Sequence, residues 1–461
     1  MKSVWRDKRV RKQSRKRVGK RVKVGAPDPR LTRFSGLAAI AEFCDKLDVV
    51  GTLDRGIGPI KQRARGASAG ELVVAIAQSQ LLGGDALVAL DRQRLDVGVA
   101  DLGAVPPIPA TTAASLARRF DEVQLAGIES GNAEVIARAV ALLGQARQSE
   151  LASRLTIDMD STDVEVYGSR KQGVAYNYAG QRAGRPHLGT WAEAGLTVAA
   201  DLLAGNADVR PRAADMLGRA LASVPEPVLT TLGQAGSVPR VRADAGYFTG
   251  DLARAAVEAG CDFAIATERS TAMWRAYSSI AGHAWVDALG MPGAQVAAVD
   301  YAPAGWPQHT YTIVRRVRVQ AEAISADARS RRRRTIDPDQ LALALAGNAA
   351  HVYAVSFIVT NIPANDTDRQ ADHVSRGTGG HGPTVVDVEA WFRRRTDIED
   401  RIREAKLGAA LRHLPSGSAT VNTVWMGAAL LAGNLSVLLQ ALTRINQGGR
   451  AHAARLRHEL L

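Results

Sequence analysis

The sequence predicts a mixed α/β sheet domain that follows a helical N-terminal region. Before about residue 150 the apolar residues recur at helical spacing. From Arg154 onward the period is two, because Leu155, Ile157 and Met159 alternate with polar residues as on a strand with one buried face. Three strands are then expected in succession, and after them helices and strands alternate, which is typical of a mixed sheet.

The helical region is predicted from capping and turn residues. Ser68 and Glu71 have the spacing of a capping box ahead of an apolar stretch, so a helix is expected to start there. A proline-rich break precedes a short helix that ends in Arg118 and Arg119, and one long helix is expected at about Val123–Glu150. This pattern fits either a helix-turn-helix reader of DNA or a plain helical bundle.

The sheet region is predicted from alternating and β-branched segments, with helices between them. We expect strands at Arg154–Asp160, Gly189–Ala194, Leu196–Leu203, Val238–Ala243, Asp262–Ala266, Tyr311–Val319 and His351–Asn361, and helices at Pro211–Val224, Leu252–Ala259 and Val388–Lys406.

Residues of about 270–350 are patterned less regularly and are interpreted as an insertion into the sheet domain. The tryptophans of this stretch either pack internally or stack on bases, and its basic run Arg331–Arg334 either contacts a DNA backbone or is solvated. These tryptophans are Trp274, Trp285 and Trp306.

The charge is concentrated at one end of the chain. Of the net charge of +13, the first 24 residues supply twelve Lys or Arg and one Asp, whereas the rest holds 47 basic and 45 acidic residues. Such an arm neutralises phosphates and favours nucleic acid as a partner. It has no apolar core of a signal peptide, and the long apolar run Trp425–Leu442 is broken by glycines and polar residues, so we expect a buried helix there and no membrane partner. The two cysteines, far apart, fit a reducing cytoplasm.

Three acidic residues lie at defined positions of predicted elements. Asp160 and Asp244 each end a strand, and Glu399 lies within a helix. Carboxylates in this arrangement suit two Mg²⁺ ions, which prefer oxygen ligands and which assist the attacking and leaving oxygens of phosphoryl transfer. Asp158 points to the same face as Asp160, so either residue could be the ligand, or Asp158 could orient Asp160 or a nearby cation.

The predicted helix around Glu399 carries a stripe of functional residue types. At 100° per residue, Phe392, Arg395, Glu399 and Lys406 fall within about 60° of one another, and Arg403 lies close beside them. A carboxylate flanked by cations can hold a metal ion while the cations bind phosphate, although a solvated face with intrahelical ion pairs has the same pattern.

This stripe resembles the Y-R-E-K signature of bacterial insertion-sequence DDE transposases, with Phe392 in the place of the tyrosine. It follows an Asp-Ser-Thr strand end and the sequence Arg-Ala-Asp-Ala-Gly-Tyr-Phe in the order that the family has, over about Leu151–Leu414. The resemblance implies an RNase H-like core with a strand-rich insertion. It also implies that Asp160, Asp244 and Glu399 are the catalytic ligands of two Mg²⁺ ions, for which Mn²⁺ substitutes.

The same resemblance implies DNA contacts and a domain order. Arg395 and Lys406 would contact transposon-end phosphates, with Phe392 and Arg403 beside them on the DNA-binding side of the helix. We expect a basic arm at 1–30, a helical DNA-binding domain at 31–150, the catalytic domain at 151–414 with its insertion at about 270–350, and a helical segment at 415–461.

The function expected from these features is cut-and-paste DNA transposition. The partners would be DNA with terminal inverted repeats and target DNA, bound by a homodimer in the cytoplasm with the nucleoid. The alternatives are an RNase H-like nuclease without strand transfer and a domesticated, non-catalytic DNA-binding protein or repressor. The presence of all three carboxylates argues against the last, because a binding module needs no metal ligands.

Overall fold

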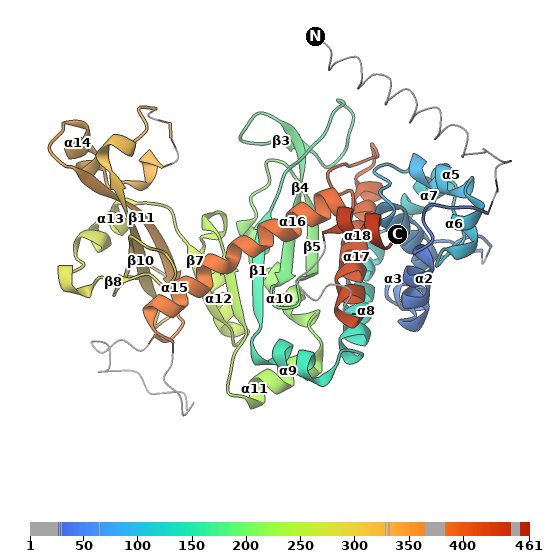
Figure 1. Ribbon diagram of the computed structural model, residues 1–461, viewed down its shortest axis with the longest axis horizontal. Coiled ribbons are helices and arrows are strands. Elements are labelled where there is room, and N and C mark those ends of the chain that lie inside the picture. Colours follow the sequence, from blue (N-terminus) through green and yellow to red (C-terminus); the bar gives the residue numbers. More distant parts are fainter. Residues whose placement is uncertain are drawn as a thin grey trace, which may run out of the picture.

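The computed structural model describes residues 26, 28, 30–63, 65–327, 329–330, 332–364, 383–443 and 452–461. The basic arm at 1–24 and Arg331 are outside the described residues. Figure 1 shows a helical region, a central sheet and a strand-rich extension that follow one another along the longest axis of the molecule.

The helical region begins its helices where the sequence predicts. Ser68 Oγ accepts a hydrogen bond from the Glu71 amide at 3.1 Å, and Glu71 Oε2 accepts one from the Ser68 amide at 2.7 Å, which completes the capping box. The single long helix expected at Val123–Glu150 is wrong, because Gly144 starts a new helix after a short break. The helices are α2 Leu37–Lys46, α3 Val49–Ile57, α4 Ala69–Leu81, α5 Val88–Arg94, α6 Val97–Leu102, α7 Ala110–Ala117, α8 Glu122–Ala141 and α9 Gln145–Ser153.

The mixed α/β sheet is confirmed. Its central strands run in the order β5-β4-β1-β6-β7, in which β5, β4 and β1 are antiparallel neighbours and β1, β6 and β7 are parallel neighbours. The strands are β1 Thr156–Ser161, β2 Val164–Glu165, β3 Ala175–Tyr176, β4 Arg182–Trp191, β5 Leu196–Ala204, β6 Arg240–Ala243, β7 Asp262–Ala266, β8 Val286–Asp287, β9 Ala294–Val299, β10 Tyr311–Gln320 and β11 His351–Thr360.

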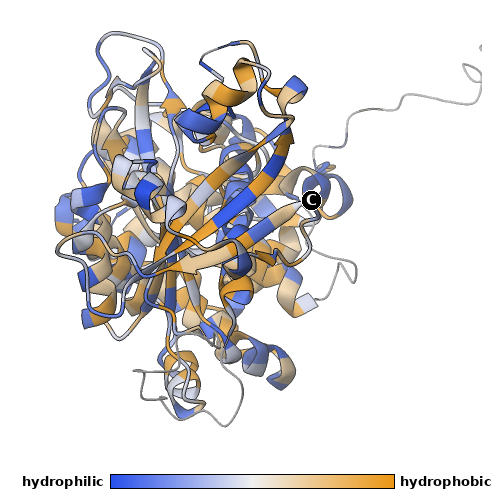
Figure 2. Cartoon of the chain, turned by 90° about the vertical axis from the view of Figure 1, so that its left-hand side faces the viewer, coloured by the Kyte–Doolittle hydropathy of each residue, from blue (hydrophilic) through white to orange (hydrophobic). Residues whose placement is uncertain are grey.

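The predicted insertion continues the same sheet. Strand β11 pairs antiparallel with β7 over three residue pairs and with β10 over ten, and β9 and β8 follow β10. Figure 2 views this end of the molecule, where hydrophobic and hydrophilic residues alternate along the strands. Between β7 and β11 lie the helices α13 Thr271–Ser278 and α14 Pro338–Leu345 and the 3₁₀ turns η2 Gly282–Ala284, η3 Ala321–Ala323 and η4 Arg333–Thr335.

Helices cover both faces of the central sheet. Gly189 of β4, which is opposite Met159 of β1, faces Met216 and Ala220, so one face is covered by the helix that holds these residues. The helices on or near the sheet are α10 Arg210–Ala222, α11 Glu226–Gln234, α12 Gly250–Glu258, α15 Val385–Arg393 and α16 Asp397–Gly408. In Figure 1, α15 and α16 run diagonally across the other face.

The expected single helix Val388–Lys406 is interrupted. The 3₁₀ turn η5, Arg394–Thr396, joins α15 to α16. A 3₁₀ turn advances about 120° per residue rather than 100°, so the predicted stripe does not stay aligned across η5.

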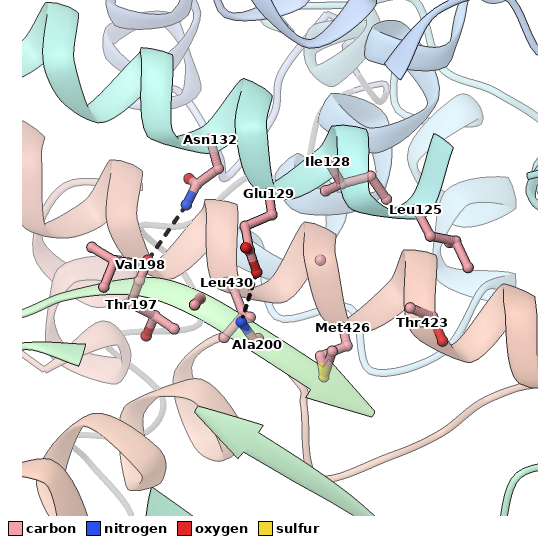
Figure 3. A pocket seen from close by; sticks show the side chains of 12 residues that line it. Leu125, Ile128, Glu129, Asn132, Thr197, Val198, Ala200, Thr423, Met426 and Leu430 are labelled. Atoms are coloured by element: carbon pink, nitrogen blue, oxygen red, sulfur yellow. Dashed lines mark hydrogen bonds between the residues drawn. The ribbon is translucent and has the colours of Figure 1, made fainter. Parts of the chain in front are cut away.

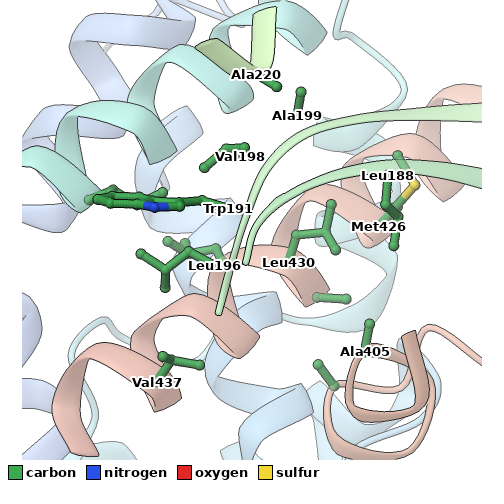
Figure 4. Packing of buried hydrophobic residues seen from close by; sticks show 14 of the residues in the cluster. Leu188, Trp191, Leu196, Val198, Ala199, Ala220, Ala405, Met426, Leu430 and Val437 are labelled. Atoms are coloured by element: carbon green, nitrogen blue, oxygen red, sulfur yellow. The ribbon is translucent and has the colours of Figure 1, made fainter. Parts of the chain in front are cut away.

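The C-terminal helices α17 Ala419–Thr443 and α18 Ala453–Glu459 join the other elements in one core. Helix α17 contacts α4, α8 and β5, and Figure 4 shows Met426, Leu430 and Val437 of α17 with Trp191, Leu196 and other residues of the sheet. Among the described residues, α17 is the one helix with the length and hydropathy of a membrane span, and most of it is buried. The prediction of a buried core helix is therefore confirmed.

The edge strand β5 is held by side chains instead of a further strand. Asn434 of α17 accepts a hydrogen bond from the Thr197 amide at 3.0 Å and donates to the Thr197 carbonyl at 2.8 Å. From α8, Asn132 donates to the same carbonyl, and Glu129 accepts from the Ala200 amide at 2.9 Å (Figure 3). The cavity beside these contacts measures about 50 Å³, which is room for water and too little for a nucleotide.

Substituting Asn434→Ala should lower the free energy of unfolding by about 2 kcal/mol or more. The partly buried Thr197 amide would then lose its partner, and leaving a buried polar group unsatisfied costs about 1–3 kcal/mol. Urea denaturation checks this, with the exposed Asn206→Ala as the control. Equal midpoints for the two variants would contradict this account of the edge strand.

Candidate active site

Two of the predicted carboxylates lie side by side at the ends of adjacent parallel strands. Met159 of β1 is the register partner of Ala243 of β6, so Asp160 and Asp244 occupy neighbouring positions one residue further on. Asp244 also caps η1, Ala245–Tyr247, by accepting a hydrogen bond from the Gly246 amide at 2.9 Å. Parallel strands end at the same edge of a sheet, and this brings residues 84 positions apart together.

Asp158 is fully engaged by a neighbouring arginine. It is the register partner of Arg242, whose Nε and Nη2 donate to the two carboxylate oxygens at 2.6 and 2.7 Å. Both side chains are buried, with exposed fractions of 1% and 3%. Arg242 also donates to the carbonyl of Trp391 in α15 and lies 4.9 Å from the centre of the Trp391 ring.

This ion pair distinguishes the two aspartates of β1. Burial raises the pKa of Asp158 to about 6, against the opposing effect of Arg242. Asp160 also has partners, because its Oδ1 accepts a hydrogen bond from the Ser161 amide at 2.7 Å and its Oδ2 lies 3.3 Å from Arg395. Its side chain is 15% exposed against 1% for Asp158, so Asp160 is the aspartate of this strand that is more accessible to a ligand. The alternative that Asp158 orients a nearby cation agrees with this geometry.

The carboxylate of Asp160 has two charged neighbours. Arg395 of η5 contacts it through Nη1 at 3.3 Å. Burial raises the pKa of Asp160, the positive charge of Arg395 lowers it, and the negative charge of Asp244 raises it further. Each of these two carboxylates disfavours the ionised form of the other, so a cation bound between them would be stabilising. Carboxylate oxygens are also the ligands that hard divalent ions prefer.

The third predicted ligand, Glu399, does not lie together with Asp160 and Asp244. Glu399 is exposed in the first turn of α16, one helical turn beyond Arg395. Among the described residues, no group of three or more His, Cys, Asp and Glu side chains is arranged to hold a metal ion. The two aspartates therefore fit a divalent ion, while the role of Glu399 stays a prediction.

The remaining residues of the predicted stripe have contacts within the protein. Phe392 is half-buried against the hydrophobic cluster of α15 and the extension. Lys406 Nζ donates to the Asp163 carbonyl at 2.9 Å, and burial lowers the pKa of this lysine. Arg403 is exposed and pairs with Asp400 at 2.7 Å.

Tyr247 is a site residue that the sequence reasoning missed. Its ring is buried beneath the acid pair and lies 5.5 Å from the ring of the buried His187. Its pKa is raised well above 10, first by burial and then by the charges of Asp160 and Asp244. In the sequence, the signal for Tyr247 is an aromatic residue three positions after an aspartate that ends a predicted strand.

The tryptophans of the extension pack internally. Trp274 lies against Phe357, Trp306 lies against Phe248 and Phe263, and Trp285 is buried with Arg316 over its ring at 3.9 Å. Of the two roles considered for these residues, the structure supports packing.

Comparison with known families identifies the class of the protein. The family model described as transposase DDE domain group 1 matches residues 15–329. The chain therefore belongs to this family of DDE transposases, whose members use divalent metal ions. The matched residues include Asp160 and Asp244, whereas Glu399 lies beyond them.

A solved structure gives one further similarity. The chain is similar to a cryo-EM structure of the piggyBac transposase synaptic complex with hairpin DNA, at 9% identity and a TM-score of 0.43, over 94% of this chain and 80% of that chain. No curated protein matches the chain.

Asp158→Asn and Asp160→Asn should differ in stability. The first leaves Arg242 as a buried charge without its counterion, which costs about 3 kcal/mol or more. The second removes a carboxylate whose ionised form burial already disfavours, so the change should stay within about 1 kcal/mol. Urea denaturation of the two variants at pH 7 measures the difference, and equal losses would contradict the division of roles.

Proposed function

We propose that this DDE transposase cuts DNA at the ends of its element and joins the freed ends to target DNA, with Asp160, Asp244 and Glu399 as metal ligands. The observation that carries the proposal is the pair of carboxylates, Asp160 and Asp244, at the ends of β1 and β6. Two residues earlier on the same strands, Asp158 and Arg242 form a separate buried ion pair. The reaction would proceed without a covalent protein–DNA intermediate, because the carboxylates act through metal ions.

The protein residues would hold and orient the reactants. Asp160 and Asp244 would bind two Mg²⁺ ions, or Mn²⁺ in their place, together with Glu399 from α16. When bound, these ions supply charge stabilisation to the attacking and leaving oxygens of the phosphodiester. Asp158 and Arg242 would keep β1, β6 and α15 in register, and Tyr247 would exclude water from beneath the acid pair.

Arg395 would neutralise Asp160 before DNA binds and contact a DNA phosphate afterwards. Its guanidinium balances the charge of Asp160 in the structure described here. Glu399 follows Arg395 by four residues, across the end of η5, so a rearrangement of η5 and the start of α16 would bring Glu399 to the site in place of Arg395 and turn Arg395 toward a DNA phosphate. Lys406 and Arg403 would extend this phosphate contact along α16, and Phe392 would support the helix by packing.

The helical region would bind DNA as well. A groove beside α7 is lined by Lys61, Arg63, Arg65 and Arg119, and none of the described residues that line it is acidic. Lys61 Nζ donates to the Arg65 carbonyl at 2.7 Å and to the two carbonyls that follow, which fixes the loop and leaves the three arginines to contact phosphates. This arrangement favours a DNA-binding region over a plain helical bundle.

The assembly and location follow from the reaction. Two element ends must be brought together, so a homodimer would form on DNA that carries terminal inverted repeats, in the cytoplasm with the nucleoid. A nuclease without strand transfer is the second candidate, because the acid pair alone supports phosphodiester cleavage.

Cleavage of a DNA fragment that carries the inverted repeat next to the coding sequence tests the proposed chemistry. The wild type should cut with Mg²⁺ or Mn²⁺, and Asp160→Ala, Asp244→Ala and Glu399→Ala should bind this fragment but reduce cutting to the level seen without metal. Joining of cut ends to a plasmid separates a transposase from a nuclease. If the wild type binds the fragment and never cuts it, the non-catalytic alternative is the better account.

Replacing Arg63, Arg65 and Arg119 by alanine should weaken binding of duplex DNA and make its salt dependence less steep. Each lost phosphate contact reduces the slope of log affinity against log salt by about 0.9, so the three together should reduce it by about 2 to 3. Fluorescence anisotropy between 50 and 200 mM salt, a range of about fourfold, measures this slope.

The control removes the same charge from arginines that are already paired. Arg210, Arg254 and Arg455 are exposed, and each forms an ion pair with a nearby acidic residue. If this control changes the slope as much as the groove variant does, affinity follows net charge and the groove has no special role.

A further inference from the structure

The segment between β2 and β4, residues 166–181, presents three exposed tyrosines, and we call it the flap. The exposed fractions are 80% for Tyr167, 69% for Tyr176 and 96% for Tyr178. The chain has eight tyrosines in 461 residues, so three exposed ones within twelve residues are a local concentration of aromatic side chains. Aromatic side chains usually bury their rings, and a group of exposed ones indicates a surface that binds a partner.

The exposure of the tyrosines follows from hydrogen bonds that fix the flap. Asn177, which is buried between two of the tyrosines, donates to Asp163 at 2.8 Å and accepts from the amides of Ala179 and Gln181 at 3.0 and 2.9 Å. Neighbouring residues of extended chain point to opposite sides, so a buried Asn177 turns Tyr176 outward. Tyr178 lies in the turn that follows, in which the Gly180 amide donates to the Asn177 carbonyl at 3.0 Å.

A second set of contacts joins the flap to the linker between α16 and α17. The Gln172 amide donates to the Gly417 carbonyl at 2.9 Å, and Lys171 Nζ donates to the Leu414 carbonyl. The linker from α16 to α17 therefore supports the flap, and α16 is the helix that carries Glu399 and Lys406.

The flap lies beyond the same sheet end as the acid pair. Strands β1 and β2 both pair with β4, so the chain continues past Asp160 along one neighbour into the flap. Tyr167 follows Asp160 by seven positions, which is at most about 23 Å of extended chain. Figure 1 shows the flap, with β3, projecting past β4.

The chemistry of the flap suits nucleic acid. The flap holds two basic residues and no acidic one in its sequence. Lys171 is engaged with the Leu414 carbonyl, and Arg170 is exposed. Aromatic rings that stack on bases, beside cations that contact the backbone, are how proteins hold single strands without a sequence preference. The positive charge and the continuity with the acid pair favour DNA over a protein partner.

We propose that the flap holds an unpaired DNA strand beside the cleaved phosphodiester by stacking its bases on Tyr167, Tyr176 and Tyr178. This inference rests on the proposed function, because it assumes that DNA is cut at the acid pair. It adds a contact surface on the opposite side of Asp160 from the extension, and it gives the exposed rings a role that the packed tryptophans do not have.

Binding of fluorescein-labelled dT20 by the full-length protein tests the inference. Replacing all three tyrosines by alanine should weaken dT20 binding by about tenfold or more, because each stacked ring contributes strongly to affinity. Replacing them by phenylalanine keeps the rings and should leave affinity within about twofold. The control is Leu95→Ala, since Leu95 is an apolar residue with an exposed fraction of 86% outside the flap.

The outcomes separate the flap from the proposed function. If the wild type cuts the inverted-repeat fragment but the alanine variant binds dT20 as tightly as the wild type, the flap inference is overturned and the transposase function stands. The same holds if the alanine variant changes the mass of the protein in light scattering without a change in dT20 affinity, since the flap would then contact a second copy. If the wild type neither binds nor cuts DNA, the proposed function itself falls.

Discussion

The buried ion pair of Asp158 and Arg242 is the constraint on which the site depends. It joins β1 to β6 through two short hydrogen bonds and joins both strands to α15 through the Trp391 carbonyl. Because side chains on one face of a strand recur every two residues, fixing Asp158 and Arg242 also fixes Asp160 and Asp244 as the next pair on that face. A neutral pair of similar shape would hold the strands, but it would give up the directional hydrogen bonds that set this register.

The acidic residues at the strand ends were predictable because strand periodicity and strand ends are local properties of the sequence. The strand containing Asp160, the capping box at Ser68 and the buried helix α17 were predicted for the same reason. The partner of Asp158 was not predictable, since Arg242 is 84 residues away and the pairing of β1 with β6 decides the contact.

Other differences arose where local patterns compete with the tertiary structure. The 100° periodicity of a helix does not reveal a 3₁₀ turn, so the sequence predicts one helix for the stripe from Phe392 to Lys406, which η5 divides. The insertion was recognised by its weaker pattern, but the sequence does not reveal that β11 would pair with β7 and continue the sheet. The exposure of the three tyrosines was not predictable, because strands of two residues and short turns have no periodicity of hydrophobic residues in the sequence.

The continuous sheet has a mechanical consequence. The extension is joined to the central strands by the β7–β11 ladder, which has three residue pairs, whereas the neighbouring β10–β11 ladder has ten. A load that DNA places on the extension would therefore reach β6 and Asp244 through this short ladder, while β9, β10 and β11 move as one stiff plate. The short ladder is where the extension and the acid pair would tilt against each other most easily, and α15, which packs against β9 and β10, would limit that tilt.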